Sequence, residues 1–209
     1  MSFNVPTIAD LIRDRRARAL LPKNVDLQGW NADNKVFDDL VERTKPKVIL
    51  EVGSWKGAST AHLAKVSEKF GSHIYCVDPW LWLRQEDDEN GSGRDLLGTP
   101  LIYNQFIRNF VGTGAASRIH PLRNTSMAMA NIFNARDVRA ELIYIDGPHE
   151  YDEAYMDVKH YSRLLAPGGI IFGDDWPLRG VFAAVVRYST ENNLGVETVD
   201  GQFWILRKP

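Results

Sequence analysis

Three aspartates stand where two apolar, strand-like runs of the chain end. Asp146 closes the run 141–146, and Asp174 and Asp175 close the run 169–174. Because the carboxyl ends of parallel strands meet at one edge of a sheet, we expect these carboxylates to converge there. Such a set of hard oxygen ligands suits Mg²⁺, with Ca²⁺ or Mn²⁺ as alternatives, and disfavours zinc. The other interpretation is that they are ordinary turn residues, but two consecutive aspartates favour a metal site.

One histidine lies close to this predicted metal site in the sequence. His149 follows Asp146 by three residues. A histidine side chain, whose ordinary pKa is about 6.5, can accept a proton near neutral pH. We therefore predict that His149 is a general base, while a cap on the next helix or a further metal ligand remains the alternative.

A turn containing two glycines, EVGSWKG over residues 51–57, follows the apolar run 47–52. Its spacing is G-x-x-x-G, which differs from the G-x-G-x-x-G of turns that bind a pyrophosphate. This favours S-adenosylmethionine (SAM), which carries an amino-acid carboxylate and no phosphate, over NAD. Free N–H groups and hydroxyls at the start of the following helix would bind that carboxylate. The candidate cofactor contacts in this part of the chain are Glu51, Gly53, Ser54, Gly57 and Ser59.

Asp78 ends the next apolar run, 73–77. A carboxylate at the end of the second strand can accept hydrogen bonds from both ribose hydroxyls of a nucleoside, as in dinucleotide-binding folds. The alternative is a turn residue placed before Pro79.

Short apolar runs alternate with helix-length segments from residue 47 onward. This alternation predicts an α/β fold with right-handed crossovers and a mostly parallel sheet. Strands are expected at 47–52, 73–77, 118–122, 141–146 and 169–174, and helices at 58–69, 100–110, 126–134, 152–165 and 179–192.

The two ends of the chain depart from the alternating pattern. Helical patterns at 7–19 and around Phe37, Leu40 and Val41 form an N-terminal extension that would cover a sheet edge or the ligand. Near the C-terminus, Asp200-Gly201 separates two apolar runs and predicts an antiparallel hairpin with a two-residue turn. We therefore expect a helical cap or lid over 1–45 and a cofactor-binding α/β domain over 46–209. The polar stretch 84–99 is predicted to be a loop.

Composition limits the compartment and the partners. The net charge of −2 gives no field that would attract nucleic acid or an anionic membrane. A single cysteine, Cys76, excludes a disulfide framework, and the first residues contain no apolar stretch suited to a signal peptide. We expect a cytoplasmic enzyme with a small-molecule partner, and the sequence leaves open whether it forms a homo-oligomer.

The chain resembles the class I SAM-dependent methyltransferases over residues 45–207. The most specific portions are IDGPHEY at 145–151 and GGIIFGDDW at 168–176. These are similar to the metal-dependent macrolide-sugar and aminocoumarin-sugar O-methyltransferases and to cephalosporin-hydroxylase-like proteins. The resemblance implies a Rossmann-like fold with a seven-stranded sheet, a SAM pocket lined by the turn residues and Asp78, and an adenine near 124–126. It also implies that the three aspartates are metal ligands. Ser126 and Asp146 thus join the candidate cofactor contacts.

Taken together, these features predict a SAM-dependent, divalent-metal-dependent O-methyltransferase. Its acceptor would be a hydroxyl of a sugar, a natural product or a catechol-like diol. Two alternatives remain open from the sequence. One is a NAD(P)-dependent oxidoreductase on a similar fold, and the other is a SAM-binding protein without catalysis.

Overall fold

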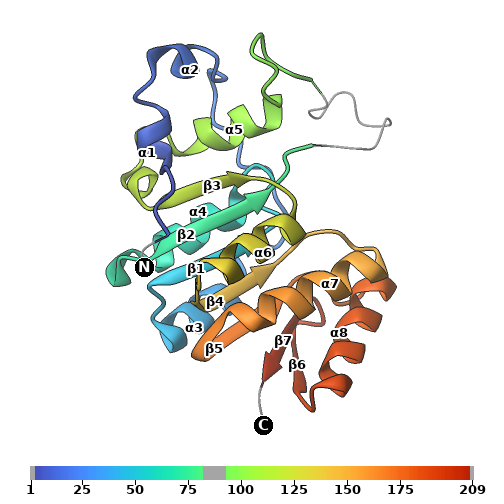
Figure 1. Ribbon diagram of the computed structural model, residues 1–209. Coiled ribbons are helices and arrows are strands. Elements are labelled where there is room, and N and C mark those ends of the chain that lie inside the picture. Colours follow the sequence, from blue (N-terminus) through green and yellow to red (C-terminus); the bar gives the residue numbers. More distant parts are fainter. Residues whose placement is uncertain (1–2, 82–92, 208–209) are drawn as a thin grey trace.

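A seven-stranded sheet in the order β3-β2-β1-β4-β5-β7-β6 lies at the centre of the molecule (Figure 1). The structure is a computed structural model that describes residues 3–81 and 93–207. Strands β1 to β5 run parallel, while β7 runs antiparallel to both β5 and β6. The predicted fold class, including the antiparallel C-terminal strands, is confirmed. The strands are β1 Val48–Val52, β2 His73–Asp78, β3 Ile119–Arg123, β4 Ala140–Ile145, β5 Leu165–Gly173, β6 Gly195–Val199 and β7 Phe203–Arg207.

Helices cover both faces of the sheet and give three layers. One face carries α1 Ile8–Leu11, α3 Lys35–Thr44, α4 Ala58–Val66 and α5 Leu101–Phe110. The opposite face carries α6 Ser126–Ala135, α7 Tyr151–Tyr161 and α8 Arg179–Glu191. The remaining helical segments are α2 Arg15–Ala19 and the short 3₁₀ turns η1 Glu68–Phe70, η3 Gly114–Ser117 and η4 Ser162–Leu164.

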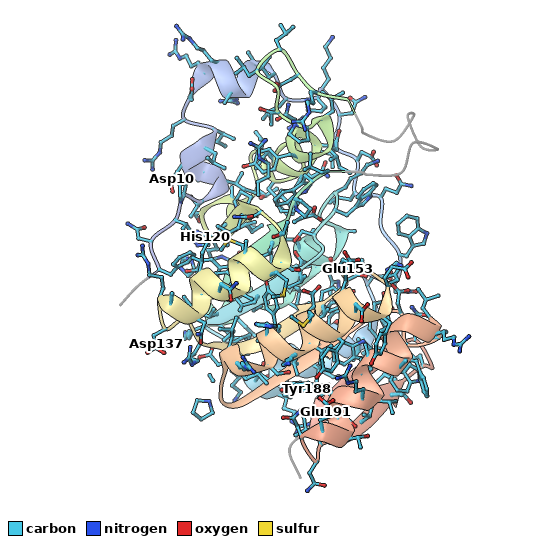
Figure 2. All side chains as sticks on the ribbon, turned by 45° about the vertical axis from the view of Figure 1, so that its right-hand side comes forward. Asp10, His120, Asp137, Glu153, Tyr188 and Glu191 are labelled. Carbon is cyan, nitrogen blue, oxygen red and sulfur yellow. The ribbon has the colours of Figure 1, made fainter. Side chains whose placement is uncertain are left out.

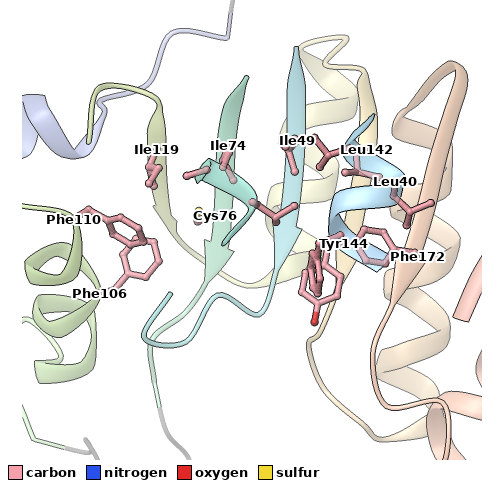
Figure 3. Close-up of a cluster of buried hydrophobic side chains, with 14 of the residues drawn as sticks. Leu40, Ile49, Ile74, Cys76, Phe106, Phe110, Ile119, Leu142, Tyr144 and Phe172 are labelled. Atoms are coloured by element: carbon pink, nitrogen blue, oxygen red, sulfur yellow. The ribbon is translucent and has the colours of Figure 1, made fainter. Parts of the chain in front are cut away.

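Alternating strand residues fill the two cores between these layers. On the α3–α5 face, Ile49, Ile74 and Leu142 are completely buried between the sheet and the helices (Figure 3). On the other face, Leu50 and Ile143 are equally buried beneath α6 and α7. This two-sided burial explains why the parallel strands are almost continuously apolar.

Helix α3 of the N-terminal extension packs on a face of the sheet, whereas residues 3–8 pass the edge strand β3, where His120 Nδ1 lies 3.0 Å from the carbonyl oxygen of Val5. Phe37 of α3 is fully buried, and its ring centroid lies 4.9 Å from that of Tyr144 and 5.4 Å from that of Phe172. Of the two expected positions, over a sheet edge or over the ligand, the edge is therefore corrected for α3 alone. The reason is that this large aromatic ring is buried against β4 and β5. Only a face of the sheet has enough apolar surface to bury it.

The single helix expected over 7–19 is two short helices. Thr7 caps α1 through a capping box with Asp10, but α1 ends at Leu11. Asp14 then accepts a hydrogen bond from the backbone N–H of Arg16 and starts α2. An aspartate at an N-cap competes with continuation of the preceding helix, which explains the break. Figure 2 labels Asp10 on α1 near His120 of the neighbouring strand β3.

Two boundaries near the C-terminus also differ from expectation. Helix α7 ends at Tyr161 and β5 starts at Leu165, whereas the sequence predicts a helix to residue 165 and a strand from residue 169. The β6–β7 turn has three residues, because Val199 pairs with Phe203. The added residue is Gln202, whose side chain points to the candidate site described below.

The expected loop 84–99 is described only in part. Residues 84–92 lie outside the described ranges, and within 93–99 Asp95 Oδ1 accepts hydrogen bonds from the backbone N–H groups of Leu97 and Thr99. In the described parts of the chain, every helix is too short or too polar to cross a lipid bilayer.

Candidate cofactor and metal site

Backbone hydrogen bonds join the carboxyl ends of four neighbouring strands into one rim. The N–H of Gly53 donates to the carbonyl of Val77 at 2.9 Å, and the N–H of Asp146 donates to Val52 at 2.8 Å. The N–H of Asp174 donates to Ile145 at 3.1 Å. The glycine turn, Asp146 and Asp174 therefore lie next to one another, as the parallel order of the strands predicts.

The two glycines of the turn are required by neighbouring protein atoms. Both have positive φ, 85° at Gly53 and 88° at Gly57. A Cβ on Gly53 would overlap the backbone carbonyl of Asp146, and one on Gly57 would lie 2.8 Å from a ring carbon of Phe110. The sequence predicts both glycines as cofactor contacts. In the structure the space beside each is already filled by the protein.

Glu51 is buried at the base of the turn and accepts three hydrogen bonds from hydroxyls. Ser54 Oγ donates at 2.7 Å, Ser59 Oγ donates at 2.8 Å, and Thr60 Oγ1 also donates. Burial raises the pKa of Glu51, while these hydroxyl donors oppose that rise. The expected arrangement, in which the hydroxyls face a ligand carboxylate, is thus not the one observed. They face Glu51, and Gly57, the N-cap residue of α4, leaves the first N–H groups of that helix without a side-chain cap.

Asp78 lies at the end of β2 and holds the turn in place. Its Oδ2 accepts from the backbone N–H of Trp55 at 2.9 Å, and its Oδ1 accepts from that of Trp80 at 2.6 Å. Burial raises its pKa, and the two backbone donors lower it in part. A carboxylate can accept further hydrogen bonds, so this geometry is compatible with a ribose contact, which remains a prediction.

Ser126 lies away from the glycine turn, at the start of α6. Its backbone carbonyl accepts a hydrogen bond from Tyr161 Oη at 3.0 Å. It is partly exposed on the same rim, beyond the end of β3. Ser126 is not part of the cluster formed by the aspartates, and its position on the rim is compatible with a cofactor contact.

Asp146, His149 and Asp175 form one compact cluster. One ligand atom from each of the three lies within 4.8 Å of the others. His149 Nε2 lies 2.7 Å from Asp175 Oδ2, and Tyr144 Oη donates to Asp146 Oδ2 at 3.1 Å. Asp146 is partly buried, and the side chain of His149 is 53% exposed. The cluster is therefore open to solvent on the histidine side.

Burial and neighbouring like charges both act on the carboxylates of this cluster. Burial, together with the nearby carboxylates of Asp174 and Asp175, raises the pKa of Asp146 to about 8. The hydrogen bond to Asp175 raises the pKa of His149, although partial burial opposes the shift. Buried like charges favour the protonated acid, and a bound cation would reverse that preference.

The third predicted metal ligand, Asp174, turns toward amide donors. Gln202 Nε2 donates to its Oδ1, and Asn31 Nδ2 lies 3.4 Å from its Oδ2. The backbone N–H of Asp175 also donates to Oδ1, at 2.7 Å. Burial raises the pKa of Asp174, and the bond from Gln202 lowers it. The structure thus brings Asp146 and Asp175 together with His149, while Asp174 lies beside them with both oxygens engaged.

Sequence reasoning missed three residues that contact the predicted site residues. Gln202 and Asn31 come from distant loops, and Tyr144 lies two positions before Asp146 on β4. The alternation of strand residues could have identified Tyr144, because it points to the same face as Asp146. No local pattern identifies the two amides, since only the tertiary fold brings them to Asp174.

The chain was compared with known proteins. The family model described as a methyltransferase domain matches residues 50–176. A comparison with curated proteins gives no match.

Several solved structures share the fold. They include the methyltransferase PaMTH1 of Podospora anserina with bound S-adenosylhomocysteine (SAH), with a TM-score of 0.61, 16% identity and coverage of 99% of this chain and 91% of that one. An O-methyltransferase from Bacillus cereus in complex with SAH gives a TM-score of 0.62, 16% identity and coverage of 96% and 90%. CalS11, a TDP-rhamnose 3′-O-methyltransferase of calicheamicin biosynthesis, gives a TM-score of 0.60 and 14% identity. The match covers 98% of this chain and 97% of that one.

The family match includes the glycine turn, Asp78, Asp146, His149 and both C-terminal aspartates of the site, so it spans the geometry described above. The structural matches cover nearly the whole chain and show the same fold. The expected class of enzyme is confirmed at this level, and the chain belongs to the methyltransferase domain family.

Proposed function

We propose that this protein is a SAM-dependent, divalent-cation-dependent O-methyltransferase that acts on a hydroxyl of a small molecule. The observation that carries the proposal is the contact between two parts of the rim. Gly53 of the turn packs directly on the backbone of Asp146, which belongs to the carboxylate cluster. A methyl donor at the turn and an acceptor at the cluster would therefore lie side by side, as an in-line transfer requires.

The residues at the cluster fit a divalent cation. Asp146 and Asp175 supply hard oxygen donors, and Asp174 lies close enough to raise the pKa of Asp146. Oxygen-rich sites of this kind suit Mg²⁺, Mn²⁺ or Ca²⁺. When bound, such a cation would lower the pKa of an acceptor hydroxyl and fix its position.

In this proposal His149 takes the proton from the acceptor hydroxyl. Its side chain is about half exposed, so a substrate can reach it, and Asp175 orients the ring through the 2.7 Å contact. The same contact stabilises the imidazolium that forms once the proton has moved. His149 also belongs to the compact cluster, so a role as a cation ligand is the alternative that the experiment below must separate.

The turn fits SAM better than a dinucleotide. The N-terminus of α4 has backbone N–H groups without a side-chain cap, and these can bind the carboxylate of the methionine part. Asp78 lies at the adjacent strand end for the ribose. Glu51 has its hydroxyl donors and serves to shape the base of the pocket. Membership of a methyltransferase family leaves the oxidoreductase alternative without support.

The test is incubation with labelled SAM, Mg²⁺ and a panel of glycosides, catechols and hydroxylated polyketides, followed by mass analysis. We expect a product that is heavier by one labelled methyl group in place of a hydrogen, with the labelled carbon on oxygen. We also expect calorimetric binding of SAH and none of NAD. Full activity in excess EDTA would remove the cation from the proposal, and SAH binding without any product would favour the non-catalytic alternative.

A further inference from the structure

An extended segment, Lys23–Asn31, crosses the outer side of the cofactor turn, and we call it the strap. Its side chains are exposed along its whole length. Backbone and side-chain polar groups therefore hold it, since it contributes almost nothing to the apolar core. Segments fixed in this way open at a low cost in free energy. The strap begins beside α5 and ends next to Asp174.

One end of the strap is fastened to the cofactor turn by Lys56 and Asn109. Lys56 Nζ lies 2.6 Å from Asp26 Oδ2 and donates to Gln28 Oε1 at 2.8 Å. Asn109 Oδ1 accepts from the N–H of Asp26, and Asn109 Nδ2 donates to the carbonyls of both Asp26 and Lys56. Lys56 and Asn109 are buried, whereas the Asp26 side chain is 50% exposed. Asn109 thus bonds to the strap and to the turn at once.

The strap also approaches the first residue of α4 without any space between them. A Cβ on Gly29 would overlap Cβ of Ala58. The φ of Gly29 is not positive, so an alanine there is acceptable to the backbone and excluded only by this contact. The N-terminus of α4 is the predicted carboxylate site for the cofactor, and the strap therefore touches that site through its backbone.

The other end of the strap reaches the carboxylates. Asn31 adopts a positive φ of 52°, and its Nδ2 lies 3.4 Å from Asp174 Oδ2. Asparagine tolerates this conformation better than most residues do. Asn31 is exposed, so its amide has no role in the apolar core.

We propose that the strap couples cofactor binding to the position of Asp174, with Asn31 as the positioning residue. A cofactor seated on the turn would favour the fastened strap, and the fastened strap would hold Asn31 against Asp174. Coupling of this kind is reciprocal, so a cation at the cluster would also strengthen cofactor binding. This inference rests on the proposed function.

Two variants open the strap by different means. Asp26→Ala removes the carboxylate that pairs with Lys56, and Gly29→Ala forces the strap away from Ala58 without removing a polar group. Asp33→Ala is the matched control, because the described part of the chain shows no hydrogen bond or ion pair for this exposed aspartate. Asn31→Gly removes the amide and keeps the positive φ available.

The first measurement is hydrogen–deuterium exchange of strap peptides in the purified protein with and without SAH. We expect SAH to slow exchange in the wild type and in Asp33→Ala, and to have little effect in Asp26→Ala and Gly29→Ala. SAH binding that leaves strap exchange unchanged in the wild type would overturn the inference while the proposed function stands.

The second measurement is Mn²⁺ affinity, followed by electron paramagnetic resonance, with and without SAH. We expect SAH to tighten Mn²⁺ binding several-fold in the wild type and in Asp33→Ala. Loss of one hydrogen bond to a charged group, as in Asn31→Gly, should weaken Mn²⁺ binding about tenfold and abolish the response to SAH. Retention of that response in both Asn31→Gly and Gly29→Ala contradicts the coupling. A wild type that binds SAH but no Mn²⁺ contradicts the proposed cation and the coupling together.

Discussion

The cofactor turn and the carboxylate cluster lie side by side on the rim, but their acidic groups have opposite surroundings. Glu51, at the turn, is fully buried and receives hydrogen bonds from three hydroxyls. Asp146, at the cluster, faces two other carboxylates, and its pKa rises to about 8. Glu51 thus has its hydrogen-bond partners within the protein. Asp146 is less well satisfied, because burial and the neighbouring carboxylates raise its pKa more than Tyr144 and His149 lower it.

The largest effect should come from breaking the contact between the two regions at Gly53. Gly53→Ala places a methyl group into the carbonyl of Asp146 at a φ of 85°. We expect a loss of about 4 kcal/mol or more in the free energy of unfolding, and no SAH binding in any protein that folds. Denaturant unfolding and calorimetry measure both.

Gly71→Ala is the matched control for this substitution. Gly71 also has a positive φ, 65°, but no atom lies within 4 Å of its missing Cβ. It should lose only about 1 kcal/mol, the cost of an alanine in the left-handed region. Equal losses at the two glycines would show that backbone conformation, and not the contact with Asp146, sets the requirement at Gly53.

The second effect concerns catalysis at the cluster. His149→Ala should lower kcat about 10²–10⁴-fold, the usual contribution of a positioned base, with a much smaller change in SAH affinity. The measurement is kcat, together with the Mg²⁺ activation constant, for His149→Ala and His149→Gln. If His149 is a cation ligand instead, activity should return at high Mg²⁺ concentration. A kcat near that of the wild type in both variants contradicts either role.

The third prediction compares the same chemical change in the two regions. Glu51→Gln replaces an acceptor of three hydroxyl donors by an amide, and it should destabilise the protein by about 1–3 kcal/mol. Asp146→Asn removes a buried acid from between like charges, and it should stabilise the cation-free protein by about 1–3 kcal/mol. It should also abolish the increase in Tm on adding Mg²⁺. Thermal unfolding with and without Mg²⁺ tests both, and equal signs for the two variants would contradict the contrast drawn above.

The sequence predicts the parts of the site that depend on strand order. Strand ends in a parallel sheet share one edge, so the positions of Asp78, Asp146 and Asp174 follow once the alternating pattern is recognised. The same reasoning predicts a metal triad of Asp146, Asp174 and Asp175 but gives no side-chain directions. The observed cluster contains His149, and Asp174 faces two amides.

Features that depend on contacts between residues far apart in the sequence could not be predicted. The three-residue turn that carries Gln202 depends on strand register, which the Asp-Gly pair alone does not determine. The two-residue prediction was therefore wrong, and with it the contact to Asp174 was missed. The contacts of Lys56 could not be predicted for a similar reason, since its partners lie 28 and 30 positions earlier in the chain. The boundary expected between residues 45 and 46 stays a prediction.

The smallest predicted effect tests a third buried acid, Asp157 of α7, which lies outside both regions. It is 1% exposed, and its Oδ2 has no hydrogen-bond partner within the described residues. Burial raises its pKa from 3.8 to about 6, and a hydrogen bond with Ser126 opposes part of that shift. Asp157 is therefore as buried as Glu51, and like Asp146 it has too few hydrogen-bond donors. We expect its ionised form to lower the stability of the protein.

The sign of this effect follows from proton binding. Between pH 3.8 and about 6 the folded state holds a proton on Asp157 that the unfolded state has lost, so stability falls as the pH rises through that window. The shift corresponds to an upper bound of about 3 kcal/mol, and we expect roughly 1 kcal/mol after relaxation around the carboxylate. Asp157→Asn should therefore be more stable than the wild type at pH 7 and lose that advantage at pH 4. Denaturant unfolding from pH 4 to 7.5 measures this, with Asp152→Asn, an exposed acid on the same helix, as the control. A constant difference between Asp157→Asn and the wild type across this range would mean that Asp157 stays satisfied when ionised, in the manner of Glu51.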